Sequence, residues 1–283
     1  MTADRGFSVD LARHGATLTL VDAGSERYEL AVDGIPQSMV SLGDPLDLRY
    51  PYVRWIARTI DAAGSPGAPL RVLHLGAGAM TLPRYVAATR PGSPQLVVEA
   101  EQALFEAVLA ALPLPEGAEV HPLFGDARAV LGALPDHPAL PADVAVIDLW
   151  DAATVSAHVS SLEFYELVLP ALAPDAVVAV NLLDGGDFRY LREQAATLRS
   201  LFPSAAVVSD ESLRTRAPLG NAVLFASNRP ALMAHHRFRE EDGGFVHLLH
   251  GERLDGWIGD TAPVTDATAT DSPSPGDARL RRR

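Results

Sequence analysis

A glycine turn followed at a set distance by a carboxylate gives this chain a candidate nucleoside site. Gly76 and Gly78 lie in Leu-Gly-Ala-Gly-Ala-Met, between a strand-like and a helix-like stretch, where glycine lets the backbone approach a ligand closely. Thr81 takes the place of the third glycine of a dinucleotide fingerprint, which argues against a dinucleotide. Glu99 follows Gly76 by 23 residues, near the spacing at which an acid accepts both ribose hydroxyls. The alternative role, an acid at the start of the next helix, suits Glu101 better.

A second carboxylate follows the next predicted strand. Asp126 stands in Phe-Gly-Asp-Ala-Arg, where it could accept a hydrogen bond from an adenine amine or cap a helix over 127–134. The two roles are compatible. Because parallel strands end at one edge of a sheet, the glycine turn, Glu99 and Asp126 together predict an adenosine-sized pocket.

Two further carboxylates close the following strand in Asp148-Leu-Trp-Asp151. An amine must lose a proton before it can act as a nucleophile, and a nearby carboxylate is the simplest base. Asp148 and Asp151 could therefore hold and deprotonate a polar acceptor. The alternative for Asp148 is a hydrogen-bonding role at the strand end. Trp150 could wall the pocket or belong to the core.

The composition excludes several kinds of chemistry. The chain has 283 residues and a net charge of −13, all 23 basic residues are arginine, and cysteine is absent. Without cysteine there is no disulfide, zinc–thiolate site or thiol nucleophile. Without lysine there is no Schiff base or lysine-containing phosphate loop. The histidines are scattered, so we expect no metal site, and a carboxylate is left as the credible base.

The charge and hydropathy also limit the partners that we expect. A nucleic-acid binder would present a basic face, and this chain is acidic. No apolar run reaches the roughly 18 residues of a membrane span, and the first residues lack the basic and apolar regions of a signal peptide. We therefore expect a cytoplasmic protein that binds neither nucleic acid nor membrane.

The first third of the chain indicates a small β-rich unit. Short β-type runs are separated by Ala23-Gly24 and Asp33-Gly34 turns, at 17–21, 27–32 and 37–42. A helical pattern over 52–62 and a Gly/Pro-rich linker over 64–69 follow. We predict an N-terminal antiparallel β-domain with a connecting helix over residues 1–63.

From residue 70 onward, strand-like and helix-like segments alternate. The predicted strands are 71–75, 95–99, 119–123, 144–148, 176–181, 205–208 and 222–226. The clearest predicted helices, which lack glycine and proline, are 101–111, 162–169 and 188–202. This alternation predicts an α/β fold, with a seven-stranded, doubly wound Rossmann-like sheet over 70–264 that binds ligand at its carboxyl edge. The polar residues 265–283 are expected to form a disordered tail.

The order and spacing of these motifs resemble a known family. The stretch 72–202 is similar to the spermidine synthases, polyamine aminopropyltransferases of the class I S-adenosylmethionine-dependent methyltransferase fold, and most to actinobacterial spermidine synthase-like members. The resemblance extends to Val-Asp-Gly-Ile-Pro-Gln-Ser at 32–38, Tyr-Pro-Tyr-Val-Arg at 50–54 and Gly-Asp-Thr-Ala-Pro-Val at 259–264. It therefore covers most of the chain apart from the two termini.

The resemblance implies a reaction and roles for individual residues. The family transfers an aminopropyl group from decarboxylated S-adenosylmethionine to an amine such as putrescine, releasing methylthioadenosine. Carried over by position, Glu99 binds ribose, Asp126 binds adenine and Asp148 is the base. Asp151 and Tyr52 lie in the acceptor site, and Gln37 lies near the transferable chain. The family usually forms homodimers through its N-terminal strands.

Three positions depart from the family pattern. Ala79 replaces the aspartate of Gly-Gly-Gly-Asp-Gly, which holds the donor amine, while Val53 and Arg54 replace the histidine and glutamate of Tyr-His-Glu. Arg54 would repel a polyamine and could instead bind a carboxylate of the acceptor or of intact S-adenosylmethionine. Two alternatives therefore stand beside aminopropyl transfer: methyl transfer from S-adenosylmethionine to a small molecule, and a non-catalytic, nucleoside-binding protein.

Overall fold

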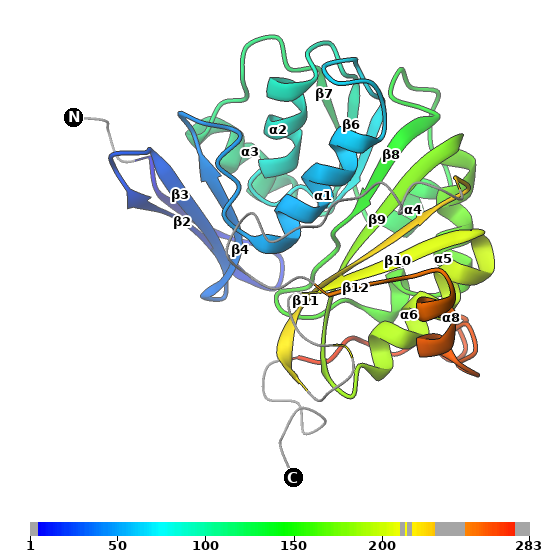
Figure 1. Cartoon of the computed structure of the whole chain (residues 1–283). Coiled ribbons are helices and arrows are strands. Elements are labelled where there is room, and N and C mark those ends of the chain that lie inside the picture. Colours follow the sequence, from blue (N-terminus) through cyan, green and yellow to red (C-terminus); the bar gives the residue numbers. More distant parts are fainter. Residues whose placement is uncertain (1–4, 210–212, 214–216, 230–246, 275–283) are drawn as a thin grey trace.

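The computed structural model describes residues 5–209, 213, 217–229 and 247–274. Two separate sheets organise this part of the chain, as Figure 1 shows, with the small N-terminal sheet at one side of a larger mixed α/β layer. None of the helices in these ranges is long and apolar enough to cross a membrane.

The small sheet is antiparallel, with its strands in chain order: β1 (Phe7–Asp10), β2 (Gly15–Asp22), β3 (Arg27–Val32) and β4 (Ile35–Ser41). The last three correspond to the predicted runs, and β1 was not predicted. The β3–β4 connection is a two-residue turn in which both Asp33 and Gly34 have positive φ, as a hairpin with right-handed twist requires. Alternating side chains from β2 and β3 form one apolar face. That face packs against α3 (Gln102–Ala111).

The large sheet contains all seven predicted strands and one more. Its order is β12-β10-β11-β9-β8-β5-β6-β7. The bounds are β5 (Val72–Leu75), β6 (Gln95–Glu99), β7 (Val120–Phe124), β8 (Ala142–Ile147), β9 (Leu172–Gly186), β10 (Ser204–Ser209), β11 (Ala217–Ser227) and β12 (His247–His250). Strands β5 to β9 run parallel, while β10, β11 and β12 add antiparallel pairs at one edge. The additional strand β12 is only four residues long, so its sequence signal is weak.

Helices cover both faces of the large sheet (Figure 1). One face carries α1 (Pro51–Ala62) and α2 (Thr81–Thr89), and the other carries α4 (Ala127–Leu131), α5 (Leu162–Val168), α6 (Arg189–Leu201) and α8 (Glu252–Ile258). Two 3-10 turns, η1 (Ala157–Val159) and η2 (Leu169–Ala171), flank α5. The connecting helix α1 buries Trp55, Ile56 and Ile60 against the large sheet, so it packs with that sheet although it precedes the linker.

The structure differs from the expected disordered tail over residues 265–274. Ser272 is buried, its N–H donates to the Val155 carbonyl and its Oγ accepts from the Val155 N–H, both at 2.9 Å. The Arg128 guanidinium pairs with both oxygens of Asp266, at 2.8 and 2.5 Å. Specific polar contacts hold this segment, and composition alone does not reveal them. Residues 275–283 lie outside the described residues.

Candidate active site

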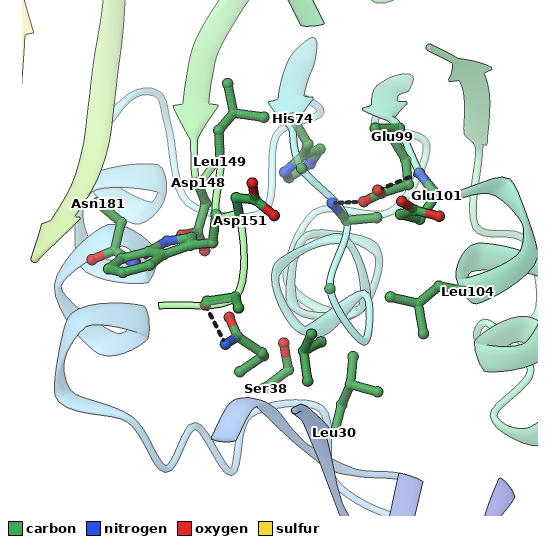
Figure 2. A pocket seen from close by; sticks show the side chains of 18 of the residues that line it. Leu30, Ser38, His74, Glu99, Glu101, Leu104, Asp148, Leu149, Asp151 and Asn181 are labelled. Atoms are coloured by element: carbon green, nitrogen blue, oxygen red, sulfur yellow. Dashed lines mark hydrogen bonds between the residues drawn. The ribbon is translucent and has the colours of Figure 1, made fainter. Parts of the chain in front are cut away.

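One cavity of about 620 Å³ lies at the carboxyl ends of the central strands. The loops after β5, β6, β7 and β8 line it from the large sheet, and residues of the small sheet and of α1 line it from the other side. Figure 2 shows Asn181 and Asp148 at one side, Glu99 and Glu101 at the other, and His74 between them. All the predicted site residues line this one cavity.

The two glycines of the first turn are required by close packing. A Cβ on Gly76 would lie 2.2 Å from the Asp148 carbonyl oxygen, and its φ is +93°. A Cβ on Gly78, whose φ is +50°, would lie 2.5 Å from Ser38 Oγ. Both positions therefore need glycine. They bring the turn into direct contact with the loop after β8 and with β4 of the small sheet.

Glu99 ends β6, and its carboxylate is fixed by backbone groups. Its two oxygens accept hydrogen bonds from the Ala77 and Glu101 N–H groups, each at 2.9 Å (Figure 2). Partial burial raises the pKa of Glu99, although these hydrogen bonds oppose the shift. The carboxylate is thus oriented by the glycine turn itself, with lone pairs left over for ligand hydroxyls.

Asp126 follows β7 and combines the two roles that the sequence left open. It caps α4 by accepting from the Ala129 N–H at 2.9 Å through Oδ1, and His158 Nε2 lies 3.2 Å from the same oxygen. Burial works most strongly against ionisation, yet the hydrogen bonds from Ala129 and His158 keep the pKa of Asp126 below its usual value. Its other oxygen, Oδ2, takes part in neither contact.

Asp148 follows β8, and within the described part of the chain one of its two oxygens accepts hydrogen bonds. Its Oδ1 accepts from Trp150 Nε1 at 2.6 Å and from Asn181 Nδ2 at 2.8 Å. Removal from water raises the pKa of Asp148, and the two hydrogen bonds oppose that rise. Oδ2 has no such partner among the described residues, so it is available to a ligand. Such a carboxylate has the geometry of a general base.

Asp151 lies beside Asp148 but is held by His14 and Arg13. Its Oδ1 lies 2.6 Å from His14 Nε2, and its Oδ2 lies 2.9 Å from an Arg13 amino group. The other ring nitrogen of His14 lies 2.6 Å from Asp33. The hydrogen bond to Asp151, and to a smaller extent the one to Asp33, raises the pKa of His14. Asp151 thus joins the small sheet to the loop after β8, and it does not present a bare carboxylate to an acceptor.

Gln37 and Tyr52 form a second connection between the small sheet and the loop after β8. Gln37 Nε2 donates to the Ala152 carbonyl at 2.8 Å, and the Tyr52 hydroxyl donates to the Gln37 carbonyl at 3.1 Å. Burial raises the pKa of Tyr52 well above its ordinary value, so its hydroxyl keeps its proton. Both side chains line the cavity, and both fix its walls through backbone carbonyls.

The three positions that depart from the family pattern lie in different environments. Val53 lines the cavity. Ala79 is fully buried and outside the lining, with its N–H donating to Ser38 Oγ at 3.2 Å. The Arg54 guanidinium donates to the Leu48 and Arg49 carbonyls at 3.1 and 2.7 Å and is not a lining residue. Arg54 therefore supports neither repulsion of a polyamine nor recognition of a carboxylate in the cavity.

Sequence reasoning missed several lining residues. His14 and His158 lie far from the acids that they contact, and no local pattern marks those pairings. Asn181 and Asn221 lie on β9 and β11, where the Asn221 amide donates to Asn181 Oδ1 at 3.1 Å. Asn181 ends the predicted strand 176–181, so the rule that polar residues at strand ends face the ligand could have found it. No group of three potential metal ligands occurs within the described part of the chain.

The comparisons with known proteins fit this geometry. No family model and no curated protein matches the sequence. Among solved structures, a probable spermidine synthase from Corynebacterium glutamicum aligns with a TM-score of 0.77 and 23% identity over 98% of this chain and 99% of its own. A spermidine synthase in complex with the transition-state analogue AdoDATO aligns at 0.58 with 17% identity, over 81% of this chain and 75% of its own. The spermidine synthase from Thermotoga maritima aligns at 0.55 with 14% identity, over 97% and 86%. The chain therefore has the fold of the spermidine synthases.

Proposed function

We propose that the protein is a transferase that binds an adenosyl sulfonium donor and transfers its aminopropyl group to an amine. One observation carries this proposal. Glu99, Asp126 and Asp148 follow the strands β6, β7 and β8 of one sheet and line a single cavity, and Asp148 has one oxygen without a hydrogen-bond partner among the described residues. The likeness to a spermidine synthase that holds AdoDATO supports the same class of donor.

The proposed donor site lies at the ends of β6 and β7. Glu99, held by the glycine turn, accepts the ribose hydroxyls, and Asp126 Oδ2 accepts from the adenine amine. In this arrangement the sulfonium lies toward the loop after β8, near Gln37. Hydrogen bonds from Ala129 and His158 keep the pKa of Asp126 below its usual value, and this favours the charged carboxylate that attracts the positive donor.

The proposed reaction needs a base and correct positioning. The acceptor amine, deprotonated by Asp148 Oδ2, attacks the propyl carbon next to sulfur. The new C–N bond forms as the C–S bond breaks, the electron pair of that bond stays on sulfur, and methylthioadenosine leaves. Because the sulfonium is already an activated leaving group, orientation and proton removal suffice.

The site offers less support for methyl transfer. That alternative used Arg54 to bind a carboxylate, and the Arg54 guanidinium instead donates to backbone carbonyls outside the cavity lining. We further propose that two copies pair through their N-terminal sheets, where β1 and β4 are the edge strands.

Ligand-induced stabilisation tests the donor site. Methylthioadenosine should raise Tm by binding only the folded state, and Glu99→Ala should remove this shift. Glu106→Ala is the matched control: Glu106 lies on α3 outside the cavity lining, and the shift should persist. A wild-type protein that responds to no adenosyl compound would refute the proposed function.

A further inference from the structure

His74 is a buried histidine in the floor of the cavity that the proposed reaction does not use. It lies on β5, two residues before the glycine turn, is only 2% exposed and lines the cavity. Its register partner on β8 is Val146, and the nearby lining residues of α1 and α2 include Val53, Leu82 and Pro83. An imidazole in such an apolar position calls for a specific partner.

The protonated nitrogen of His74 can be assigned from its neighbour. Gln95 Nε2 lies 3.1 Å from the Pro83 carbonyl, which can only accept, so this amide end is the donor. Gln95 Oε1 then faces His74 Nε2 at 3.0 Å and must accept from it. Nε2 therefore carries the proton, and Nδ1 carries a lone pair. Burial lowers the pKa of His74 to about 4, although the Gln95 hydrogen bond opposes this, so the ring is neutral at physiological pH.

No group among the described residues donates a hydrogen bond to the Nδ1 lone pair of His74. His74 also shares one face of the sheet with the acceptor side of the cavity. Side chains alternate along each strand, and Val146, Ala179 and Val223 belong to the apolar cluster on the α1 side. Asp148, Asn181 and Asn221 each lie two residues from one of these three, so they lie on the α1 side as well. His74 lies on that side too, because its register partner is Val146.

We infer that His74 is an acceptor-binding residue, whose Nδ1 accepts a hydrogen bond from the far end of an amine that Asp148 deprotonates at its near end. This inference rests on the proposed function and narrows its substrate class. The far end carries an uncharged hydrogen-bond donor, such as a hydroxyl. A second ammonium bound to His74 would lose water beside the apolar lining residues Val53, Leu82 and Val146, and the neutral imidazole supplies no counter-charge for it.

Three amines of matched length test this inference: aminobutanol, pentylamine and putrescine. We expect wild-type kcat/KM to be about tenfold higher for aminobutanol than for pentylamine, since one buried hydrogen bond contributes about 1.4 kcal/mol. Putrescine should also be poorer than aminobutanol. His74→Phe keeps a flat ring but has no lone pair. In this variant the kcat/KM values for aminobutanol and pentylamine should be about equal.

Two controls keep the outcome interpretable. His121→Phe removes a histidine of β7 that is exposed and outside the cavity lining, and it should preserve the wild-type preference. Methylthioadenosine should still raise the Tm of His74→Phe, which shows an intact donor site. If His74→Phe does not fold, Gln95→Met is the second variant. It removes the acceptor that holds the proton on His74 Nε2, so the proton can move to Nδ1, and the preference for aminobutanol over pentylamine should fall.

Each result has a distinct meaning. A wild-type enzyme that uses pentylamine or putrescine as well as aminobutanol overturns the inference but leaves aminopropyl transfer standing. A preference that His74→Phe leaves intact, or a His74→Phe effect on the donor KM alone, also overturns it. Failure of all amines and of methylthioadenosine binding would instead reject the proposed function.

Discussion

At the scale of residues, the asymmetry of Asp148 determines what the site can do. Trp150 and Asn181 both donate to Oδ1, so the carboxylate is held in one orientation while Oδ2 remains open to a ligand. Asn221 in turn donates to Asn181, which fixes the direction of the Asn181 amide. Asn181 is therefore a positioning residue for the proposed base.

The acid side of the pH profile should report on this arrangement. Asp148 must be ionised to accept a proton, and its pKa is raised by burial, so activity should fall with acidification at a pH above the ordinary aspartate value. Asn181→Ala removes a hydrogen bond that favours the charged form. It should shift the acid limb of kcat/KM to still higher pH. A profile that keeps its position while the rate falls would show that Asn181 affects packing only.

At the scale of elements, the turn between β5 and α2 depends on contacts that glycine alone allows. Gly76→Ala would place a methyl group against the Asp148 carbonyl at a positive φ. We expect a loss of about 2 kcal/mol or more in unfolding free energy, together with weaker methylthioadenosine binding. Gly15→Ala is the matched control, because Gly15 has no atom within 4 Å of the added Cβ. Chemical denaturation of both variants measures the difference, and equal losses would contradict this account of the turn.

The small sheet is connected to the active-site loop by His14, which lies between Asp33 and Asp151. Asp151 is the largest cause of the raised pKa of His14. An NMR titration of His14 should therefore show a pKa above 6.5 in the wild type that falls toward 6.5 in Asp151→Asn. A raised pKa means that the contacts with Asp151 and Asp33 favour protonated His14. This connection should therefore weaken as the pH rises through the His14 pKa. A wild-type His14 pKa that is not raised would contradict the contact between His14 and Asp151.

The elements also show what the sequence could and could not predict. Buried apolar runs such as 95–99 and 144–148 were clear because a parallel strand is covered on both faces. The strand-end rule then predicted that Glu99, Asp126 and Asp148 share one pocket; they line the same cavity, and their roles there stay predictions. It could not find the pairing of His14 with Asp151, since the two residues are 137 positions apart and only the docking of the small sheet brings them together. The position of the proton on the His74 ring likewise depends on Gln95, a partner on the neighbouring strand.

At the scale of the whole molecule, the segment 265–274 packs on the side of the large sheet that carries α4 and α5. Truncation after residue 264 should lower the unfolding free energy by about 2 kcal/mol, because the two buried hydrogen bonds between Ser272 and Val155 each contribute about 1 kcal/mol. Truncation after residue 274, which keeps both hydrogen bonds, is the comparison and should give the more stable of the two chains. Thermal or urea unfolding measures both. Equal stability of the two truncated chains would show that the segment contributes nothing.

The acidity of the molecule also gains a clearer meaning. Of the carboxylates that line the cavity, Glu99 is fixed by backbone N–H groups and Asp151 is paired with Arg13 and His14. Glu101 and Asp126 lie in the loops after β6 and β7, on the proposed donor side, and Asp148 is the carboxylate that faces the proposed acceptor. The charge of −13 is thus mostly a property of the rest of the surface, and it does not by itself indicate a polycationic substrate.

The central claim is that this cavity transfers an aminopropyl group. The most direct measurement is the nucleoside released when the protein is incubated with decarboxylated S-adenosylmethionine and an amine, followed by chromatography and mass spectrometry. The account predicts methylthioadenosine together with an aminopropylated amine, and Asp148→Asn should slow this release by about a hundredfold or more. Release of S-adenosylhomocysteine from S-adenosylmethionine, with no methylthioadenosine from the decarboxylated donor, would contradict it.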